Sequence, residues 1–385
     1  MKVYFKNLDG IRFIAALLVI LHHAQFFKAH HQVGQLSFLN EAFVSTGRIG
    51  VNLFFVLSGF LISYLLMSEN AQTGTINFKN FYFRRILRIW PLYLAYGISL
   101  TLIAPYLFNM MGIPTAEDSR TIFTNLIFLL LFAVNIQLAF FPYNKGILEI
   151  TWSVCIEEQF YLLWPLLLLL FRKRLKSLFM VLITIGFTSK LLCLILPYFF
   201  DVKAEYLLET SYLLLFDKLE LFGTGMFAAY ILFHRERYLG FLSKGFTKPI
   251  QIAMLLLTVL VIFSVLKIPV VSKYYFDHFI HAALFGYLML AAVSENSLLN
   301  LEYPIMKTLG KISYGIYMFH TPVCQLLIIV FIKIFGAGRS LIIYDLLYPI
   351  ACVVVTCIIA YFSYEWYEKR FLRIKSKYAV VHTRI

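Results

Sequence analysis

The sequence predicts an all-α fold: a polytopic bundle of membrane-spanning helices with about ten crossings and one re-entrant segment. Of its 385 residues, 61% are hydrophobic and only 14% are charged. Several apolar runs reach about 18 residues or more, the length that a helix needs to span a bilayer. The formal net charge of +14 comes from Lys and Arg residues that cluster between these runs. The positive-inside rule therefore explains the charge without a nucleic-acid partner.

The first three spans are separated by polar segments. The first apolar run covers residues 8–23, and we expect it to be retained rather than cleaved as a signal peptide, because Arg12 lies inside it and no small-x-small site follows. A polar loop at 28–48 leads to a second span at 51–67. A polar segment at 69–88 ends in several cations, which mark a cytoplasmic face, and a third span follows at 90–104.

The apolar run at 121–141 creates a parity problem. If it crossed the membrane fully, the later cations at 172–176 would lie outside. We therefore expect 121–141 to re-enter instead of crossing. Irregular backbone at membrane depth needs cover from protein or a wet cavity, so this choice also predicts a cavity.

The remaining chain supplies the other crossings and no second domain. The spans are expected at 152–171, 178–198, 211–232, 249–267, 276–293, 312–333 and 341–362. Both termini then lie in the cytoplasm, and residues 1–385 form a single integral-membrane domain with no appended soluble domain.

Neither the cysteines nor the paired histidines indicate a metal site or a disulfide framework. The five cysteines all lie in apolar segments and are expected to be packing residues. His278 and His281, beside Asp277, have a spacing that suits a metal, but no third ligand is indicated. We therefore expect no bound metal.

Arg12 and His23 are costly residues to place in an apolar helix. They are eleven positions apart, so at about 100° per residue they return to within roughly 20° of one face, about 16 Å apart along the axis. His22 points elsewhere. An ionisable residue inside a membrane segment is by default a candidate functional residue.

The cations Arg84, Arg85 and Arg88 head the third span and allow two interpretations. They can set the topology and contact lipid headgroups. Alternatively, Arg85 and Arg88, three residues apart, can grip an anionic ligand, because guanidinium groups bind phosphates bidentately. Arg12, also near the cytoplasmic end of its helix, can join them in a site for an anionic cofactor.

Two further stretches combine polar and aromatic residues. In 151–165, Ser153 precedes Glu157 and Glu158, and either carboxylate can sit at the interface near the helix N-terminus or face the bundle. In 309–322, Ser313, Tyr314, Tyr317 and His320 form a stripe, which is also typical of interfacial anchors.

Taken together, these motifs resemble the integral-membrane acyltransferase-3 family, which moves acyl groups onto sugars and other acceptors of bacterial envelopes. The resemblance covers essentially the whole chain. It rests on five stretches in the family's order, which are Leu8-Asp9-Gly10 through His23, 50–62, 81–88, 152–165 and 310–320.

The resemblance implies roles for individual residues. The family's Arg and His with ten intervening residues fall on Arg12 and His23, its Arg-x-x-Arg on Arg85 and Arg88, and its Ser-x-x-x-Glu on Ser153 and Glu157. The expected catalytic residues are His23, Glu157 and Ser153; those for cofactor binding are Arg12, Arg85 and Arg88; and those for substrate binding are Tyr317, His320 and Trp152. Asn52 stands where the family often has Asp, so no carboxylate at that position is required.

The implied reaction is O-acetyl transfer from cytoplasmic acyl-CoA, with acetyl-CoA as the expected donor and no permanently bound cofactor. The acceptor is a hydroxyl of an envelope carbohydrate or glycolipid, and the enzyme lies in the bacterial inner membrane. Histidine titrates near physiological pH, which suits His23 as the general base. Direct transfer and a covalent acyl-enzyme both remain open. Two other classes stay as alternatives: a transporter or flippase of lipid-linked sugars, and a non-catalytic sensor or scaffold.

Overall fold

The computed structural model describes residues 2–34, 42–103, 105–106, 110, 119–141, 148–266, 271, 275–338, 340–378 and 382–383. Within these residues the chain is helical apart from a short parallel pair, β1 (Lys2–Val3) with β2 (His382–Thr383). The helices are α1 (Leu8–His30), α3 (Thr46–Thr73), α4 (Phe78–Leu102), α6 (Ser119–Leu130), α7 (Val134–Phe140), α8 (Trp152–Leu170), α9 (Leu175–Ile195), α10 (Ala204–Tyr212), α11 (Leu219–Phe233), α12 (Leu239–Gly245), α13 (Lys248–Ile262), α15 (Asp277–Val293), α16 (Pro304–Lys311), α17 (Ser313–Phe335), α18 (Tyr348–Ser363) and α19 (Lys369–Lys375). Short turns of other helix types are η2 (Glu149–Thr151), η3 (Leu196–Tyr198), η4 (Leu215–Lys218), η5 (Arg235–Tyr238), η6 (Leu341–Leu347), η7 (Tyr364–Glu368) and η8 (Ser376–Tyr378).

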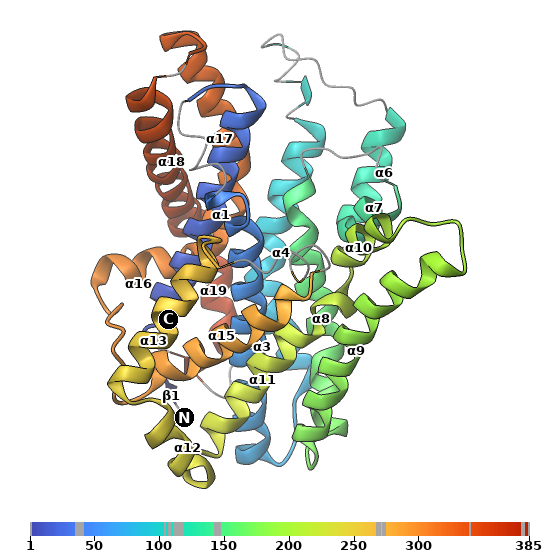
Figure 1. Cartoon of the computed structure of the whole chain (residues 1–385), viewed down its shortest axis with the longest axis vertical. Helices are drawn as coiled ribbons and strands as arrows, with labels where there is room; N and C mark the ends of the chain where they lie inside the picture. Colours follow the sequence, from blue (N-terminus) through green and yellow to red (C-terminus); the bar gives the residue numbers. More distant parts are fainter. Residues whose placement is uncertain are drawn as a thin grey trace.

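Among the described residues, six helical stretches are long and apolar enough to cross a membrane (Figure 1). They are Leu8–His30, Thr46–Thr73, Glu149–Leu170, Leu175–Tyr198, Ser313–Phe335 and Leu341–Lys375. A seventh is formed if Arg235–Gly245 and Lys248–Ile262, which are bent by 80°, count as one broken span. The all-helical class and the membrane-spanning character are therefore confirmed, and the number of ten crossings stays a prediction.

Two of the expected segments are broken. The range 121–141 divides into α6 and α7, and Phe132 at the break has a positive φ of 51° and stacks on Tyr93 with 4.3 Å between the ring centroids. Whether this segment re-enters the membrane stays a prediction. The range 211–232 begins at the end of α10 and becomes helical again only through η4 and α11.

A buried charge network accounts for the second break. In η4, Asp217 and Lys218 are both buried, and Lys190 of α9 lies 2.9 Å from Asp217 Oδ1 and 2.9 Å from Glu220 Oε1 of α11. Lys218 Nζ lies 3.0 Å from Asp217 Oδ2. Charges inside an apolar bundle must be paired, so the chain turns here to bring these groups together.

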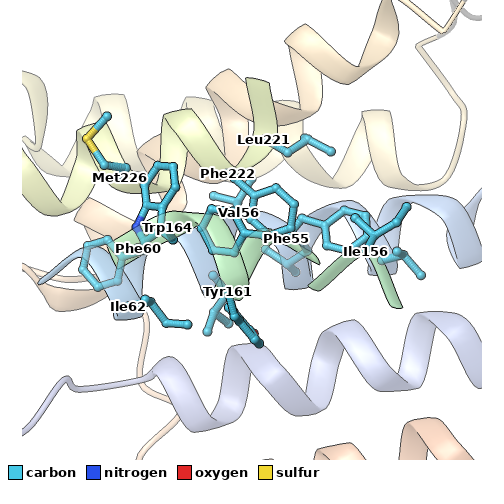
Figure 2. Close-up of a cluster of buried hydrophobic side chains, with 14 of the residues drawn as sticks. Phe55, Val56, Phe60, Ile62, Ile156, Tyr161, Trp164, Leu221, Phe222 and Met226 are labelled. Carbon is cyan, nitrogen blue, oxygen red and sulfur yellow. The ribbon is translucent and has the colours of Figure 1, made fainter. Parts of the chain in front are cut away.

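The main core lies between α3, α8 and α11 (Figure 2). Phe160 of α8 stacks on Phe222 of α11 with ring centroids 3.9 Å apart. At the crossing of α3 and α11, a Cβ atom on Gly225 would collide with the backbone of Val56, and one on Gly59 with the backbone of Phe222. Glycine therefore allows the two backbones to pack closely, as is common for membrane helices.

Both ends of α1 are anchored by polar contacts. At its start, the Asn7 side chain donates to Ala292 O at 2.8 Å and accepts from Leu301 N at 2.7 Å. At its far end, the buried Lys28 pairs with Asp345 of η6. These contacts fix the register of the helix that carries Arg12 and His23.

The cysteines and the two histidines His278 and His281 occupy packed positions. Four of the five cysteines are buried, as expected for packing residues. His281 Nδ1 lies 3.1 Å from Asn52 Nδ2, and His278 packs beside the Lys190 network. No group of three or more potential metal ligands occurs within the described part of the chain.

Candidate active site

A cavity inside the bundle collects polar side chains from α1, α3, α4, α8 and α17. Six of the nine predicted site residues line it: Arg12, Arg85, Arg88, Ser153, Glu157 and Tyr317. Other polar and aromatic lining residues are Tyr4, Phe5, Asp9, Phe54, Phe55, Ser58, Tyr161, Lys311, Ser313, Tyr314, Tyr364, Glu368 and Lys375. The fold thus brings together predicted site residues that are far apart in the chain.

The cations of this cavity come from four helices, α1, α4, α16 and α19, and we call Arg12, Arg85, Arg88, Lys311 and Lys375 the cationic group. Arg12 Nη1 lies 2.6 Å from Asp9 Oδ1, one turn earlier on α1. The guanidinium carbon of Arg85 lies over the rings of Phe81 and Tyr161, at 5.7 and 5.6 Å from their centroids. Arg85 Nε is buried and has no hydrogen-bond partner within the part of the chain that the structure describes.

Arg88 and Lys375 also lack a carboxylate within ion-pair distance among the residues that the structure describes. Several cations that are not neutralised by the protein favour an anionic ligand, since buried or recessed charge is costly without a partner.

Glu157 faces the cavity, which settles the choice that the sequence left between the two adjacent glutamates. Ser58 Oγ donates to Glu157 Oε1 at 2.8 Å, and Tyr161 OH lies 3.0 Å from Oε2. Glu158 instead accepts from Trp90 Nε1 at 2.9 Å and does not line the cavity. The described contacts of Glu157 do not include His23, so its carboxylate does not orient that imidazole directly.

Ser153 and Tyr317 form one hydrogen-bonded unit at the same cavity. Tyr317 OH donates to the carbonyl oxygen of Ile150 at 3.0 Å, so its single proton is used there. Ser153 Oγ, 2.6 Å from the Tyr317 oxygen, must then be the donor between these two hydroxyls. Ser153 therefore positions Tyr317, and no base among the described residues contacts its hydroxyl to activate it as a nucleophile.

His23 contacts His320 of α17, which sequence reasoning had assigned to substrate binding. His320 Nε2 lies 3.2 Å from His23 Nδ1, and the two ring centroids are 4.7 Å apart. His23 Nδ1 also lies 3.0 Å from the carbonyl oxygen of Val19.

These contacts assign the tautomers of both rings. A carbonyl oxygen only accepts, so His23 Nδ1 carries a proton toward Val19, and His320 Nδ1 carries one toward the carbonyl oxygen of Tyr317. His320 Nε2 then accepts from Thr321 Oγ1, which lies 3.1 Å away, and shares the single Nδ1 proton of His23 with the carbonyl oxygen of Val19. In the neutral pair, His23 Nε2 is left with the free lone pair that a general base requires.

Tyr317 and His320, one turn apart on α17, connect the cavity with the histidine pair. Tyr317 lines the cavity, its ring centroid lies 5.5 Å from that of His320, and its carbonyl oxygen holds His320 Nδ1. Figure 1 shows α1 and α17 beside each other, consistent with their contacts. Arg12 and His23 therefore lie at two depths of one helix, with the cavity alongside.

Trp152 is separate from this arrangement. Its ring packs on Tyr212 at 5.2 Å and on Phe55 at 6.3 Å between centroids, and it does not line the cavity. Sequence reasoning missed Lys375 and Tyr161 as lining residues. Lys375 lies among several Lys and Arg residues between 369 and 377, and nothing in its spacing distinguishes it from them.

Comparison with known proteins places the chain in a family. A family model described as an acyltransferase domain matches residues 5–365. The chain belongs to the acyltransferase-3 family. It is 27% identical over 350 residues to the peptidoglycan O-acetyltransferase OatA of Listeria monocytogenes, covering 84% of this chain and 50% of that protein.

Other relatives match shorter parts. A putative O-acetyltransferase of Staphylococcus aureus is 32% identical over 183 residues, covering 45% of this chain and 27% of that protein. The putative peptidoglycan O-acetyltransferase YrhL of Bacillus subtilis is 30% identical over 168 residues, covering 43% of this chain and 24% of that protein. The chain thus spans half or less of the length of each of these relatives. No solved structure matches the chain.

Proposed function

We propose that the protein is a membrane O-acetyltransferase that transfers an acetyl group from cytoplasmic acetyl-CoA to a hydroxyl of an envelope carbohydrate. The observation that carries this proposal is the cavity that holds the cationic group and reaches Tyr317, whose carbonyl oxygen holds the His320 ring against His23 just beyond the cavity lining. Because two relatives are named as peptidoglycan O-acetyltransferases, peptidoglycan is the first acceptor to test.

The donor fits the distribution of charge in the cavity. Acetyl-CoA carries a diphosphate and a ribose phosphate at one end and the thioester at the end of a long arm. Arg12, Arg85 and Arg88 bind the phosphates, since guanidinium groups suit phosphate oxygens. The arm then runs along the cavity toward His23, about 16 Å from Arg12 at 1.5 Å per helical residue.

In the reaction, His23 Nε2 takes the proton of the acceptor hydroxyl as its oxygen attacks the thioester carbonyl. The carbon–sulfur bond breaks, and the leaving sulfur receives that proton from the imidazolium. The products are an acetyl ester and free coenzyme A. His320 Nε2 accepts from His23 Nδ1. This contact keeps His23 Nε2 as the basic nitrogen and stabilises the His23 imidazolium that forms. Direct transfer needs no acyl-serine, which agrees with the donor role of the Ser153 hydroxyl.

Acetyl transfer by purified protein in liposomes tests the proposal. The assay measures release of the coenzyme A thiol together with esters on added peptidoglycan fragments. We expect His23→Ala to reduce turnover by about 10²- to 10⁴-fold, the usual contribution of a general base. His22→Gln is the matched control, because His22 contacts the backbone of Phe43 instead of His320, and it should keep most of the activity. Full turnover by His23→Ala, or movement of a lipid-linked sugar without thioester consumption, would contradict the proposal.

We propose that the protein lies in the inner membrane of a bacterium. Its chain crosses that membrane ten times, and both termini lie in the cytoplasm. This arrangement places the cationic group beside the cytoplasmic pool of acetyl-CoA. Cysteine labelling from outside intact cells tests it, in a background without native cysteines. A cysteine at exposed Lys377 should stay unlabelled, and one at exposed Tyr198, at the outer end of the fifth expected span (178–198), should react. The reverse pattern would refute this orientation.

A further inference from the structure

The segment that follows α18 returns to the cavity instead of leaving the bundle. Helix α19 packs against α4, and the Tyr378 ring of η8 stacks on Phe83 with 5.2 Å between the centroids. Arg84 Nη1 donates to the carbonyl oxygen of Tyr378 at 2.7 Å, and its Nη2 lies 3.0 Å from Glu69 Oε2. The segment is therefore attached to the same helix that carries Arg85 and Arg88.

This attachment brings Lys375 into the cavity among like charges. Its ammonium group is near enough to be repelled by the lining arginines Arg88, Arg85 and Arg12, and Arg84 adds to this repulsion. No carboxylate pairs with Lys375 within the described ranges, although Lys369 on the same helix pairs with Glu365 at 2.7 Å. A cation held against three others needs an anion to offset the repulsion.

Lys375 also differs from the arginines in the chemistry it offers. An ammonium group is a compact charge on a flexible stem, whereas a guanidinium is a rigid fork. A phosphate already gripped by arginines from α1 and α4 can therefore accept a further contact from Lys375 without a fixed geometry. The neighbouring Lys377 is exposed and does not line the cavity.

We propose that Lys375 is a further donor-binding residue that contacts the phosphates at the nucleotide end of acetyl-CoA and completes the site formed by Arg12, Arg85 and Arg88. This inference rests on the proposed function. It assigns the segment from Lys369 to Tyr378 to the donor site, where the family motifs place no residue.

The test compares Lys375→Gln with Lys377→Gln in the acetyl-transfer assay, using acetyl-CoA and S-acetylpantetheine, which keeps the thioester arm but lacks the nucleotide. We expect Lys375→Gln to raise the KM for acetyl-CoA about tenfold, the usual scale for one hydrogen bond to a charged group. The kcat should stay unchanged, since the contact is equal in ground and transition states. Turnover of S-acetylpantetheine should not change, which also shows that the variant is folded. Lys375→Arg should restore the KM to within a few-fold, and Lys377→Gln should match the wild type.

The outcomes separate this inference from the proposed function. If the wild type consumes acetyl-CoA and Arg85→Gln raises its KM, but Lys375→Gln does not, the inference about Lys375 is wrong and the function stands. An equal loss with both donors would also overturn it, because the residue would then act on the fold or on the chemistry. If the wild type consumes no acetyl-CoA, the proposed function fails first and the inference fails with it.

Discussion

The contact between His320 and His23 predicts a defined loss of catalytic rate. We consider His320→Leu, which removes the acceptor at Nε2 and keeps an apolar side chain in a fully buried position. The base still has a partner, because the carbonyl oxygen of Val19 remains 3.0 Å from His23 Nδ1. The substitution therefore removes one of two acceptors and leaves the base itself in place.

The magnitude follows from the change of charge during the reaction. A hydrogen bond between neutral groups contributes about 0.5–1.5 kcal/mol, and one with a charged donor about 1.5–3 kcal/mol. His23 is neutral before the reaction and cationic at the transition state, so the bond to His320 gains about 1–1.5 kcal/mol there. Since about 1.4 kcal/mol corresponds to a factor of ten, kcat should fall roughly tenfold. The KM for acetyl-CoA should not change, because His320 lies outside the cationic group.

Steady-state release of coenzyme A by protein in liposomes measures both constants. His320→Gln offers an amide oxygen near the position of Nε2 and should recover part of the rate. Thr321→Val removes only the second donor to His320 Nε2, so its kcat should match the wild type. Thermal unfolding of each variant in detergent identifies any that are not folded. A folded His320→Leu variant with a kcat within twofold of the wild type would refute the positioning role, as would a Gln variant no faster than the Leu variant.

Three further predictions concern stability. Lys190→Met leaves the buried Glu220 carboxylate without its lysine, while Asp217 keeps Lys218, and it should destabilise the fold by about 3–5 kcal/mol, whereas combining it with Glu220→Leu should recover part of the loss in thermal midpoint. Gly225→Leu places a side chain against the α3 backbone and should abolish the monodisperse peak in size-exclusion chromatography, and a normal peak would show that the helices can separate there. Burial alone would raise the pKa of Glu302, but hydrogen bonds from Lys307, Tyr4 and the Asn7 N–H lower it overall. Because folding lowers this pKa, the ionised carboxylate stabilises the fold above the ordinary pKa of about 4.3, and this stabilisation is lost as the pH falls from there toward the lower pKa of the folded state. The difference in thermal midpoint between wild type and Glu302→Gln should therefore shrink from pH 6 to pH 3.5.

The sequence predicted the membrane-helical class because apolar length is a local property. Most expected spans have counterparts within a few residues, such as 312–333 for α17 and 276–293 for α15. The failures occur where a tertiary contact interrupts an apolar run. The range 211–232 contains Asp217 and Lys218, whose burial depends on Lys190 from another helix, and no periodicity within the run reveals that partner.

The site was predicted in part for the same reason. The spacing of Arg12 and His23 on one helix is local and indicates one face. The partner of His23 is not local, because His320 lies 297 residues away and its stripe resembles that of an interfacial anchor. Residue spacing alone left Glu157 and Glu158 open until the family motif indicated Glu157, and the partner of that carboxylate, Ser58, is also not local because the fold brings it from α3.

The balance of charge in two polar regions distinguishes a structural network from a binding site. In the Lys190 network, two lysines meet two carboxylates, Asp217 and Glu220, so the described charges cancel and no ligand is needed. The cavity has the opposite balance: five cations line it with three carboxylates, Asp9, Glu157 and Glu368, and protonation of any of these would increase the excess. Both regions pay the cost of removing charge from water, but only the first recovers it from the protein alone. The second recovers it when an anion binds, so binding of free coenzyme A should raise the thermal midpoint of the wild type and should do so less in Arg88→Gln.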